Sequence, residues 1–172
     1  MTDLNIDDYI ATYPDFPIEG ILFRDISPLL ASHDAMTAAM DQFFEQLAPF
    51  KPDGFAGIES RGFLFSTLLA QRFGTGSYIL RKPGKLPGDL IEETYALEYG
   101  TNTLTAQANL DLKNKKIVLV DDLLATGGTV KAASTLVKRL GGNPVALAAV
   151  IHLTDLPGAD VIDLPLVSLV AY

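Results

Sequence analysis

The residue types best suited to chemistry gather in one thirteen-residue segment, IVLVDDLLATGGT, at positions 117–129. Four apolar residues precede two adjacent acids, and a short turn then leads into Thr126-Gly127-Gly128-Thr129. The glycines let the backbone curl so that successive N–H groups point at one spot, and the start of a following helix adds further donors. We therefore expect the loop from Ala125 to Thr129 to bind a phosphate group.

The adjacent acids, Asp121 and Asp122, suit a different part of a ligand, because carboxylates beside a phosphate repel it. Carboxylates accept hydrogen bonds from vicinal hydroxyls, and they also bind hard cations such as Mg²⁺. The acids therefore predict a ribose diol or a Mg²⁺ ion near the phosphate loop. A phosphate and a diol a few ångströms apart are the features of a ribose 5-phosphate. The chain has neither a GxxxxGK[ST] nor a GxGxxG pattern.

Basic residues cluster in two places although the chain as a whole is acidic. Arg61 stands at an expected strand-to-helix turn, and the loop RKPGKLPG at 81–88 supplies Arg81, Lys82 and Lys85. Cations and outward-pointing N–H groups at such turns stabilise polyanions. Their local density favours a small polyanionic ligand over nucleic acid.

Short apolar runs alternate with helical periodicities, and these elements would position the residues above. The pattern predicts a parallel sheet flanked by helices, with ligands at the carboxyl ends of the strands. The Pro/Gly-rich loop at 81–90 precedes two more expected strands, at 92–99 and 103–109, joined across Gly100. Such an inserted hairpin is typical of a lid. The expected core strands lie at 53–59, 77–80, 117–120 and 145–151, and the expected helices at 60–73 and 129–140.

Composition excludes several classes of protein. The 172 residues include 13 basic and 21 acidic ones, for a net charge of −8, which repels nucleic acid and anionic membranes. Cysteine is absent, which excludes disulfides, Cys-zinc sites and thiol nucleophiles. The acidic amino terminus does not resemble a signal peptide, and no linker or repeat interrupts the chain. We expect a single soluble, intracellular domain over 1–172 whose apolar end, LVSLVAY, is buried as a final strand or at a subunit contact.

Taken together and in order, these motifs resemble the type I phosphoribosyltransferase family. The segment at 117–129 is similar to its phosphoribosyl-pyrophosphate signature, ESRGF at 59–63 to its pyrophosphate loop, and 81–88 and 97–100 to the two ends of its lid. Phe16-Pro17 and GILFRDISP at 20–28 resemble the base-binding segment of members that use adenine. The resemblance covers nearly the whole chain. It implies an α/β fold with a mostly parallel sheet flanked by helices, a flexible lid hairpin at about 81–109 and an amino-terminal base-binding hood at about 1–34.

The resemblance also implies a reaction, in which adenine and 5-phosphoribosyl 1-pyrophosphate give AMP and pyrophosphate. It implies Mg²⁺ held mainly through the substrate, near Asp121 and Asp122, and a cytoplasmic homodimer in which Arg81 can serve its own or the neighbouring subunit's site. A non-proline cis peptide in the 59–61 turn is a further implication. Catalytic roles fall to Glu98, as general acid/base, and to Arg61 and Lys82. The phosphoribosyl pyrophosphate ligands implied are Asp121, Asp122, Ala125, Thr126, Gly127, Gly128, Thr129, Arg61, Arg81, Lys82 and Lys85; Leu22, Phe23 and Arg24 would bind adenine, and Tyr99 would support the closed lid.

Three other functions compete with this one. A transferase for oxopurines or pyrimidines would share the fold, but oxopurine enzymes need a side-chain donor for the 6-oxo group, and Val130 follows the TGGT here. A non-catalytic regulator would carry a DNA-binding domain and a basic surface. A phosphosugar-binding module would leave the pyrophosphate-side cations without a role.

Overall fold

A five-stranded parallel sheet forms the centre of residues 43–172 in the computed structural model, which describes residues 4–96 and 100–172. The strand order is β4-β3-β7-β8-β9. All five residues of β3 are buried, as a strand covered on both faces requires. The bounds are β3 Gly54–Ile58, β4 Gly76–Leu80, β7 Lys116–Leu124, β8 Asn143–His152 and β9 Leu166–Ala171.

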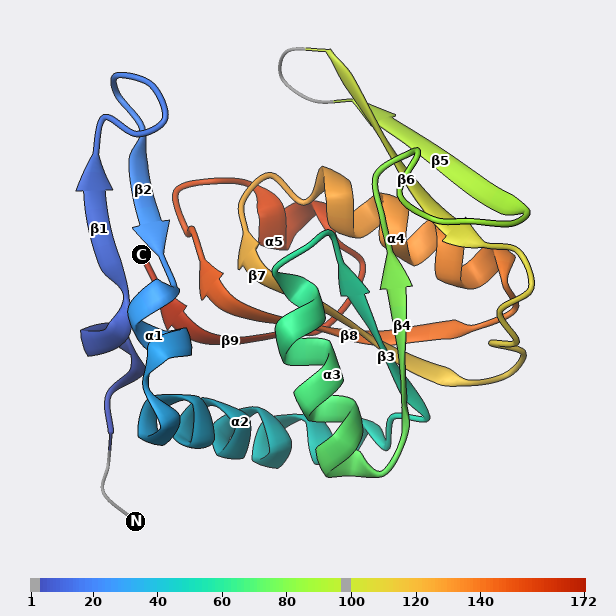
Figure 1. The fold of residues 1–172 in the computed structure, drawn as a ribbon, viewed down its shortest axis with the longest axis horizontal. Coiled ribbons are helices and arrows are strands. Elements are labelled where there is room, and N and C mark those ends of the chain that lie inside the picture. Colours follow the sequence, from blue (N-terminus) through green and yellow to red (C-terminus); the bar gives the residue numbers. More distant parts are fainter. Residues whose placement is uncertain (1–3, 97–99) are drawn as a thin grey trace. The chain divides into compact units, whose positions relative to one another are not determined.

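Helices cover both faces of this sheet (Figure 1). Helix α3 (Gly62–Phe73) contacts β3, β4 and β7, whereas α4 (Gly128–Arg139) packs against alternate residues of the strands, such as Ile117 and Leu119. Alternate residues of a strand point to opposite faces, so the two helices bury different sets of strand side chains. The short α5 (Gly158–Val161) contacts α4.

An antiparallel hairpin formed by β5 (Leu90–Ala96) and β6 (Thr101–Gln107) packs on α4 (Figure 1). Arg139 at the end of α4 fixes it by donating to the carbonyl oxygen of Glu92 at 2.6 Å. The antiparallel pairing confirms the expected hairpin, but β5 begins at Leu90 and not at residue 92, and β6 occupies 101–107 in place of 103–109. Glu98 and Tyr99 lie outside the described residues.

The amino-terminal unit, residues 1–42, contains a second small sheet. Strands β1 (Ala11–Pro14) and β2 (Leu22–Asp25) pair antiparallel, and the intervening turn holds a cis Phe16–Pro17 bond. The predicted hood segment, about 1–34, falls within this unit. Its remaining elements are the 3₁₀ helix η1 (Ile6–Tyr9), α1 (Ser27–Ala31) and most of α2 (His33–Leu47); a second 3₁₀ helix, η2 (Ala48–Phe50), follows α2.

The parallel sheet and its flanking helices confirm the expected α/β architecture, and the apolar end of the chain forms the partly buried edge strand β9. Several strand boundaries differ from the expected ones, and the difference at β7 matters most: β7 continues to Leu124, so Asp121 and Asp122 belong to the strand itself and do not follow its end. Pairing with β8 explains the extension, because the register continues through Leu124 and His152. Within residues 4–96 and 100–172, every helix is too short or too polar to cross a bilayer.

Candidate functional site

A cavity of about 280 Å³ opens where β3 and β7 end. The two strands are parallel neighbours, so the loops that follow them meet at the same edge of the sheet. This adjacency joins the predicted pyrophosphate loop to the predicted phosphate loop. The cavity is lined by Glu59, Arg61, Lys82, Tyr95, Asn102, Leu104, Asp121, Asp122, Leu123, Leu124, Ala125, Thr126, Gly127, Thr129 and Val130.

The loop between β7 and α4 turns sharply at Gly127. Gly127 adopts a φ of 81°, and a Cβ there would meet Val161 Cγ2 at 2.5 Å and the carbonyl oxygen of Gly158 at 3.0 Å. Helix α5 thus supports the loop tightly from behind, and a side chain at Gly127 would push it away. Gly128 is the first residue of α4, whose twelve residues supply unpaired N–H groups at their start. This arrangement fits a phosphate.

The two acids at the end of β7 form an electrostatically unfavourable pair. The N–H of Asp122 donates to Asp121 Oδ1 at 2.9 Å, and only 5% of Asp122 is exposed. Burial, together with the neighbouring charge of Asp122, raises the pKa of Asp121 well above its usual range. Arg61 Nε lies 2.9 Å from Asp122 Oδ2 and offsets part of the negative charge. A ligand that brings hydroxyl donors or a cation would stabilise the pair further.

The acids also fit the expected Mg²⁺. Among the described residues, no group of three His, Cys, Asp or Glu side chains could hold a metal ion. Mg²⁺ in phosphate-transfer sites keeps several waters and is bound by one or two carboxylates together with substrate phosphates. Asp121 and Asp122 match that donor set.

Helix α3 begins unusually close to β7, and this closeness positions Arg61. A Cβ on Gly62 would collide with the carbonyl oxygen of Val120 and would lie 3.2 Å from Asp121 Cα. Glycine is therefore required where the helix meets the strand. The Glu59–Ser60 peptide just before it is cis, as the resemblance implied.

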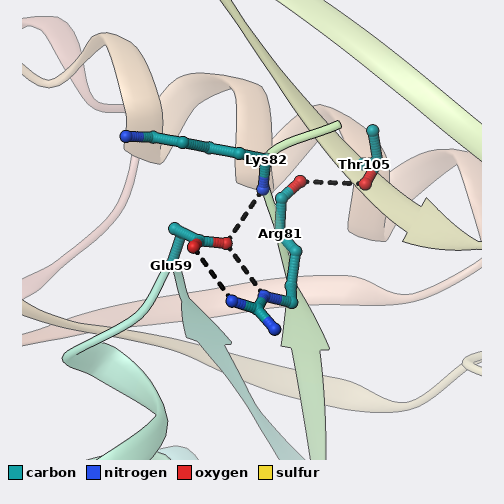
Figure 2. A network of polar contacts seen from close by, with 4 residues as sticks. All are labelled: Glu59, Arg81, Lys82 and Thr105. Atoms are coloured by element: carbon teal, nitrogen blue, oxygen red, sulfur yellow. Dashed lines mark hydrogen bonds and ion pairs between the residues drawn. The ribbon is translucent and has the colours of Figure 1, made fainter. Parts of the chain in front are cut away.

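Cations of the predicted basic loop differ in their surroundings, because one lines the cavity and another is paired with a carboxylate. Lys82 lines the cavity, whereas Arg81 Nε and Nη2 donate to the two carboxylate oxygens of Glu59, at 3.0 and 3.1 Å (Figure 2). The hydrogen bond from Arg81 lowers the pKa of Glu59. Arg81 and Lys85 are not among the residues that line the cavity.

Two wall residues, Glu59 and Tyr95, have no individual role assigned from the sequence, although Glu59 belongs to the segment that resembles the pyrophosphate loop. The Thr129 hydroxyl donates to the Tyr95 phenol oxygen at 3.0 Å, which joins the hairpin to the phosphate loop. Tyr95 gives no local signal, because only the docking of β5 on α4 brings it there. Glu59 could have been found, since it is an acid one residue past a strand at the ligand-binding edge.

The predicted adenine residues lie on β2 in the amino-terminal unit. Leu22 is 51% exposed, and Phe23 packs edge-on against Phe16 with ring centroids 5.1 Å apart. Arg24 Nη1 donates to Thr12 Oγ1 at 2.8 Å. These contacts describe β2 itself, and the adenine assignment stays a prediction.

A family model, curated relatives and solved structures all relate this chain to phosphoribosyltransferases. Residues 25–161 match the model of the phosphoribosyl transferase domain. An adenine phosphoribosyltransferase of Rhodospirillum rubrum is 48% identical over 169 residues, 98% of this chain and 99% of that protein. The crystal structure of adenine phosphoribosyltransferase from Thermoanaerobacter pseudethanolicus superposes with a TM-score of 0.93 at 40% identity, covering 97% of this chain and 98% of that one. The Saccharomyces cerevisiae enzyme, in complex with D-2,5-dideoxy-2,5-imino-altritol 1,6-bisphosphate and adenine, has a TM-score of 0.89 at 36% identity, covering 95% and 96%.

Proposed function

The chain belongs to the adenine phosphoribosyltransferase family, and from this premise we propose how its residues carry out the reaction. The enzyme makes AMP and pyrophosphate from adenine and 5-phosphoribosyl 1-pyrophosphate in purine salvage. Its β7–α4 loop, Ala125 to Thr129, would bind the 5′-phosphate, and Asp121 and Asp122 would accept hydrogen bonds from the 2′- and 3′-hydroxyls.

One observation carries this pose: Asp122 is followed along the chain by the phosphate loop, while its carboxylate contacts Arg61 of the neighbouring loop at 2.9 Å. In this pose the acids would lie between the proposed phosphate site and the cationic residues of the same cavity. A substrate with a 5′-phosphate, a diol and a 1-pyrophosphate has its groups in the same order.

The transition state of glycosyl transfer resembles an oxocarbenium ion, with positive charge on the ribose and negative charge on the leaving group. Arg61 and Lys82 would stabilise the departing pyrophosphate, with Lys85 and Arg81 on the basic loop adding positive charge. Asp121 and Asp122 would place negative charge beside the ribose. Mg²⁺ bound with the substrate would neutralise further phosphate charge near these two acids.

Adenine would be bound by the β2 segment. We propose that Phe23 stacks on the purine and that Leu22 and Arg24 line its edge, because β2 presents the exposed Leu22 and the half-buried Phe23 beside an arginine that is held by Thr12. Glu98 would act as general acid/base toward the imidazole ring of the purine, and Tyr99 would support the closed lid.

The expected homodimer gains support from apolar side chains on the surface of residues 43–172. Leu64 and Leu68, one turn apart on α3, are 45% and 42% exposed, and Ile79 on the edge strand β4 is 40% exposed. Pairing of two copies through α3 and β4 would bury them. Phosphoribosyl pyrophosphate is a polyanion that does not diffuse across bilayers, and we propose that the enzyme uses it in the cytoplasm.

The experiment is an assay of nucleotide formation with phosphoribosyl pyrophosphate and Mg²⁺ against adenine, hypoxanthine and guanine in parallel. We expect AMP from adenine and no product from the oxopurines. The variant to compare with the wild type is Asp122→Asn. It keeps the shape of the side chain but removes one of the carboxylate oxygens that would accept a hydrogen bond from the ribose hydroxyls. Product from hypoxanthine or guanine would contradict the assignment of Phe23 and Arg24, and binding without any product would favour a regulator.

A further inference from the structure

Glu59 has no role in the chemistry proposed above, yet this acidic residue lines the cavity in which we propose that the polyanionic substrate binds. We propose that Glu59 is a positioning residue, which fixes Arg81 and the backbone of Lys82 so that the Lys82 side chain is directed into the pyrophosphate side of the cavity. The proposal rests on the pyrophosphate site proposed above.

Both oxygens of Glu59 are used by this dipeptide. Oε1 accepts from Arg81 Nη2 at 3.1 Å, and Oε2 accepts from Arg81 Nε at 3.0 Å and from the N–H of Lys82 at 2.9 Å. Sheet register brings them together: Ile58 pairs with Leu80, so Glu59 and Arg81 are the next residues of two adjacent parallel strands. The carboxylate thus joins the pyrophosphate loop to the first residues of the basic loop.

Arg81 is fixed from other sides as well. Its backbone exchanges hydrogen bonds with Thr105 of β6, at 2.9 and 2.6 Å, and the Thr105 hydroxyl donates to the Arg81 carbonyl oxygen at 2.9 Å (Figure 2). Its guanidinium carbon lies 5.4 Å from the centre of the Phe63 ring. The backbone of Arg81 is thus held by Thr105, while its guanidinium lies between Glu59 and the Phe63 ring and compensates the charge of Glu59.

Lys82 is the residue that this support directs. Its N–H is held by Glu59 while its side chain extends away from the Arg81 guanidinium (Figure 2), and it lines the cavity. Because the backbone of Lys82 is already fixed, less conformational entropy is lost when its side chain binds pyrophosphate. The hydrogen bond with Arg81 lowers the pKa of Glu59, and the positive charge of the arginine offsets the carboxylate charge that would otherwise stand beside the polyanion.

The test is a double-mutant cycle with Glu59→Gln, Arg81→Gln and the double variant, in which KM for each substrate, kcat and the thermal midpoint are measured. Glu93→Gln is the matched control, because Glu93 forms an arginine pair too, with Arg139 at 3.4 Å, but does not line the cavity. Synthesis of AMP by the wild-type protein tests the proposed function separately. If the wild type makes no AMP, the proposed function is wrong, whatever the variants show.

We expect Glu59→Gln to raise KM for phosphoribosyl pyrophosphate about tenfold, as for loss of a charge-assisted pair. Arg81→Gln should raise it about 100-fold, because it also leaves an uncompensated carboxylate facing the polyanion. In the Glu59→Gln background Arg81→Gln should raise this KM by a clearly smaller factor than it does in the wild type, because the ion pair is already lost and only the positive charge of Arg81 is then removed. KM for adenine should change less than about twofold in all variants, since the support acts on pyrophosphate alone. Glu93→Gln should match wild type.

An equal effect of Arg81→Gln in the wild-type and Glu59→Gln backgrounds would overturn the proposal, because Arg81 would then act independently of Glu59. Parallel losses for both substrates would also overturn it, since they would indicate a general structural role. If Arg81→Gln does not fold, Arg81→Lys gives the same readout: it keeps the charge and loses the two-pronged bond, and its effect should again shrink in the Glu59→Gln background.

Discussion

Replacing Gly62 by alanine would test whether the close approach of α3 to β7 positions the active site. The added Cβ would meet the carbonyl oxygen of Val120, with the Val120 carbonyl carbon and Asp121 Cα both at 3.2 Å. Overpacking costs about 1–3 kcal/mol, and alanine recovers about 1 kcal/mol in a helix. The atoms met belong to the backbone of a central strand, so the cost should lie at the upper end. We expect a net loss of about 2 kcal/mol in the free energy of unfolding.

That loss would lower the thermal midpoint by about 4–8 °C for a domain of this size. Activity should be affected more strongly than stability. A shift of α3 that relieves the collision would move Arg61 Nε away from Asp122 Oδ2, which lies 2.9 Å from it in the wild type. Misplacement of a positioned group by about 1 Å costs roughly 100-fold, so kcat/KM for phosphoribosyl pyrophosphate should fall about that far.

Thermal unfolding and the AMP assay measure the two effects. Gly76→Ala is the matched control: its Cβ would meet only Tyr78, at 3.5 and 3.7 Å, which is ordinary contact, and its stability and activity should stay near wild type. If Gly62→Ala kept wild-type activity and stability, the contact between α3 and β7 would not be what positions Arg61.

Three further variants test other parts of the site. Asp121→Asn should raise the free energy of unfolding at neutral pH and lower activity. The pKa of Asp121 is higher in the folded protein than in the unfolded chain, so the wild type loses stability as the pH rises from about 4 through the folded-state pKa. Denaturant unfolding at a series of pH values measures this. The extra stability of the variant should vanish below about pH 4, where Asp121 is protonated in both the folded and the unfolded wild type. Tyr95→Phe removes the acceptor of Thr129 and should cost about 1 kcal/mol of stability, with a severalfold rise in KM for phosphoribosyl pyrophosphate; unchanged values in both assays would show that the bond at 3.0 Å does not couple hairpin and loop. Glu98→Gln should lower kcat by roughly 10²–10⁴ with no change in thermal midpoint, and wild-type turnover would exclude the general acid/base role.

The sequence was sufficient for features that depend on local pattern. The alternation of apolar runs and helical periods predicted the parallel sheet, and the paired glycines predicted a sharp backbone turn into α4, where Gly127 adopts a positive φ. The phosphate loop and the adjacent acids could be identified because their chemistry is carried by consecutive residues. Helix α2 has a signal that the sequence analysis did not use: Met36, Ala39, Met40, Phe43 and Leu47 follow a helical spacing.

Features that depend on pairing between distant segments could not be predicted. The end of β7 was placed too early, because hydrogen bonds to β8, not residue type, extend the strand through Asp121 and Asp122. The support of the phosphate loop by α5 was missed for the same reason: Gly158 lies against the Ala125 carbonyl through a contact between residues more than thirty positions apart.

The relation between Glu59 and Arg81 shows most clearly what the fold adds to the motifs. Each residue belongs to a recognisable segment, and each segment alone suggests a ligand for pyrophosphate. Sheet register places them one step beyond paired residues, so their side chains form an ion pair. A motif identifies which side chains are present at a site, but the pairing of strands decides which of those charges are already paired before a ligand binds. In this cavity the register assigns Arg81 to Glu59 and leaves Lys82 as the residue of the basic loop that lines it.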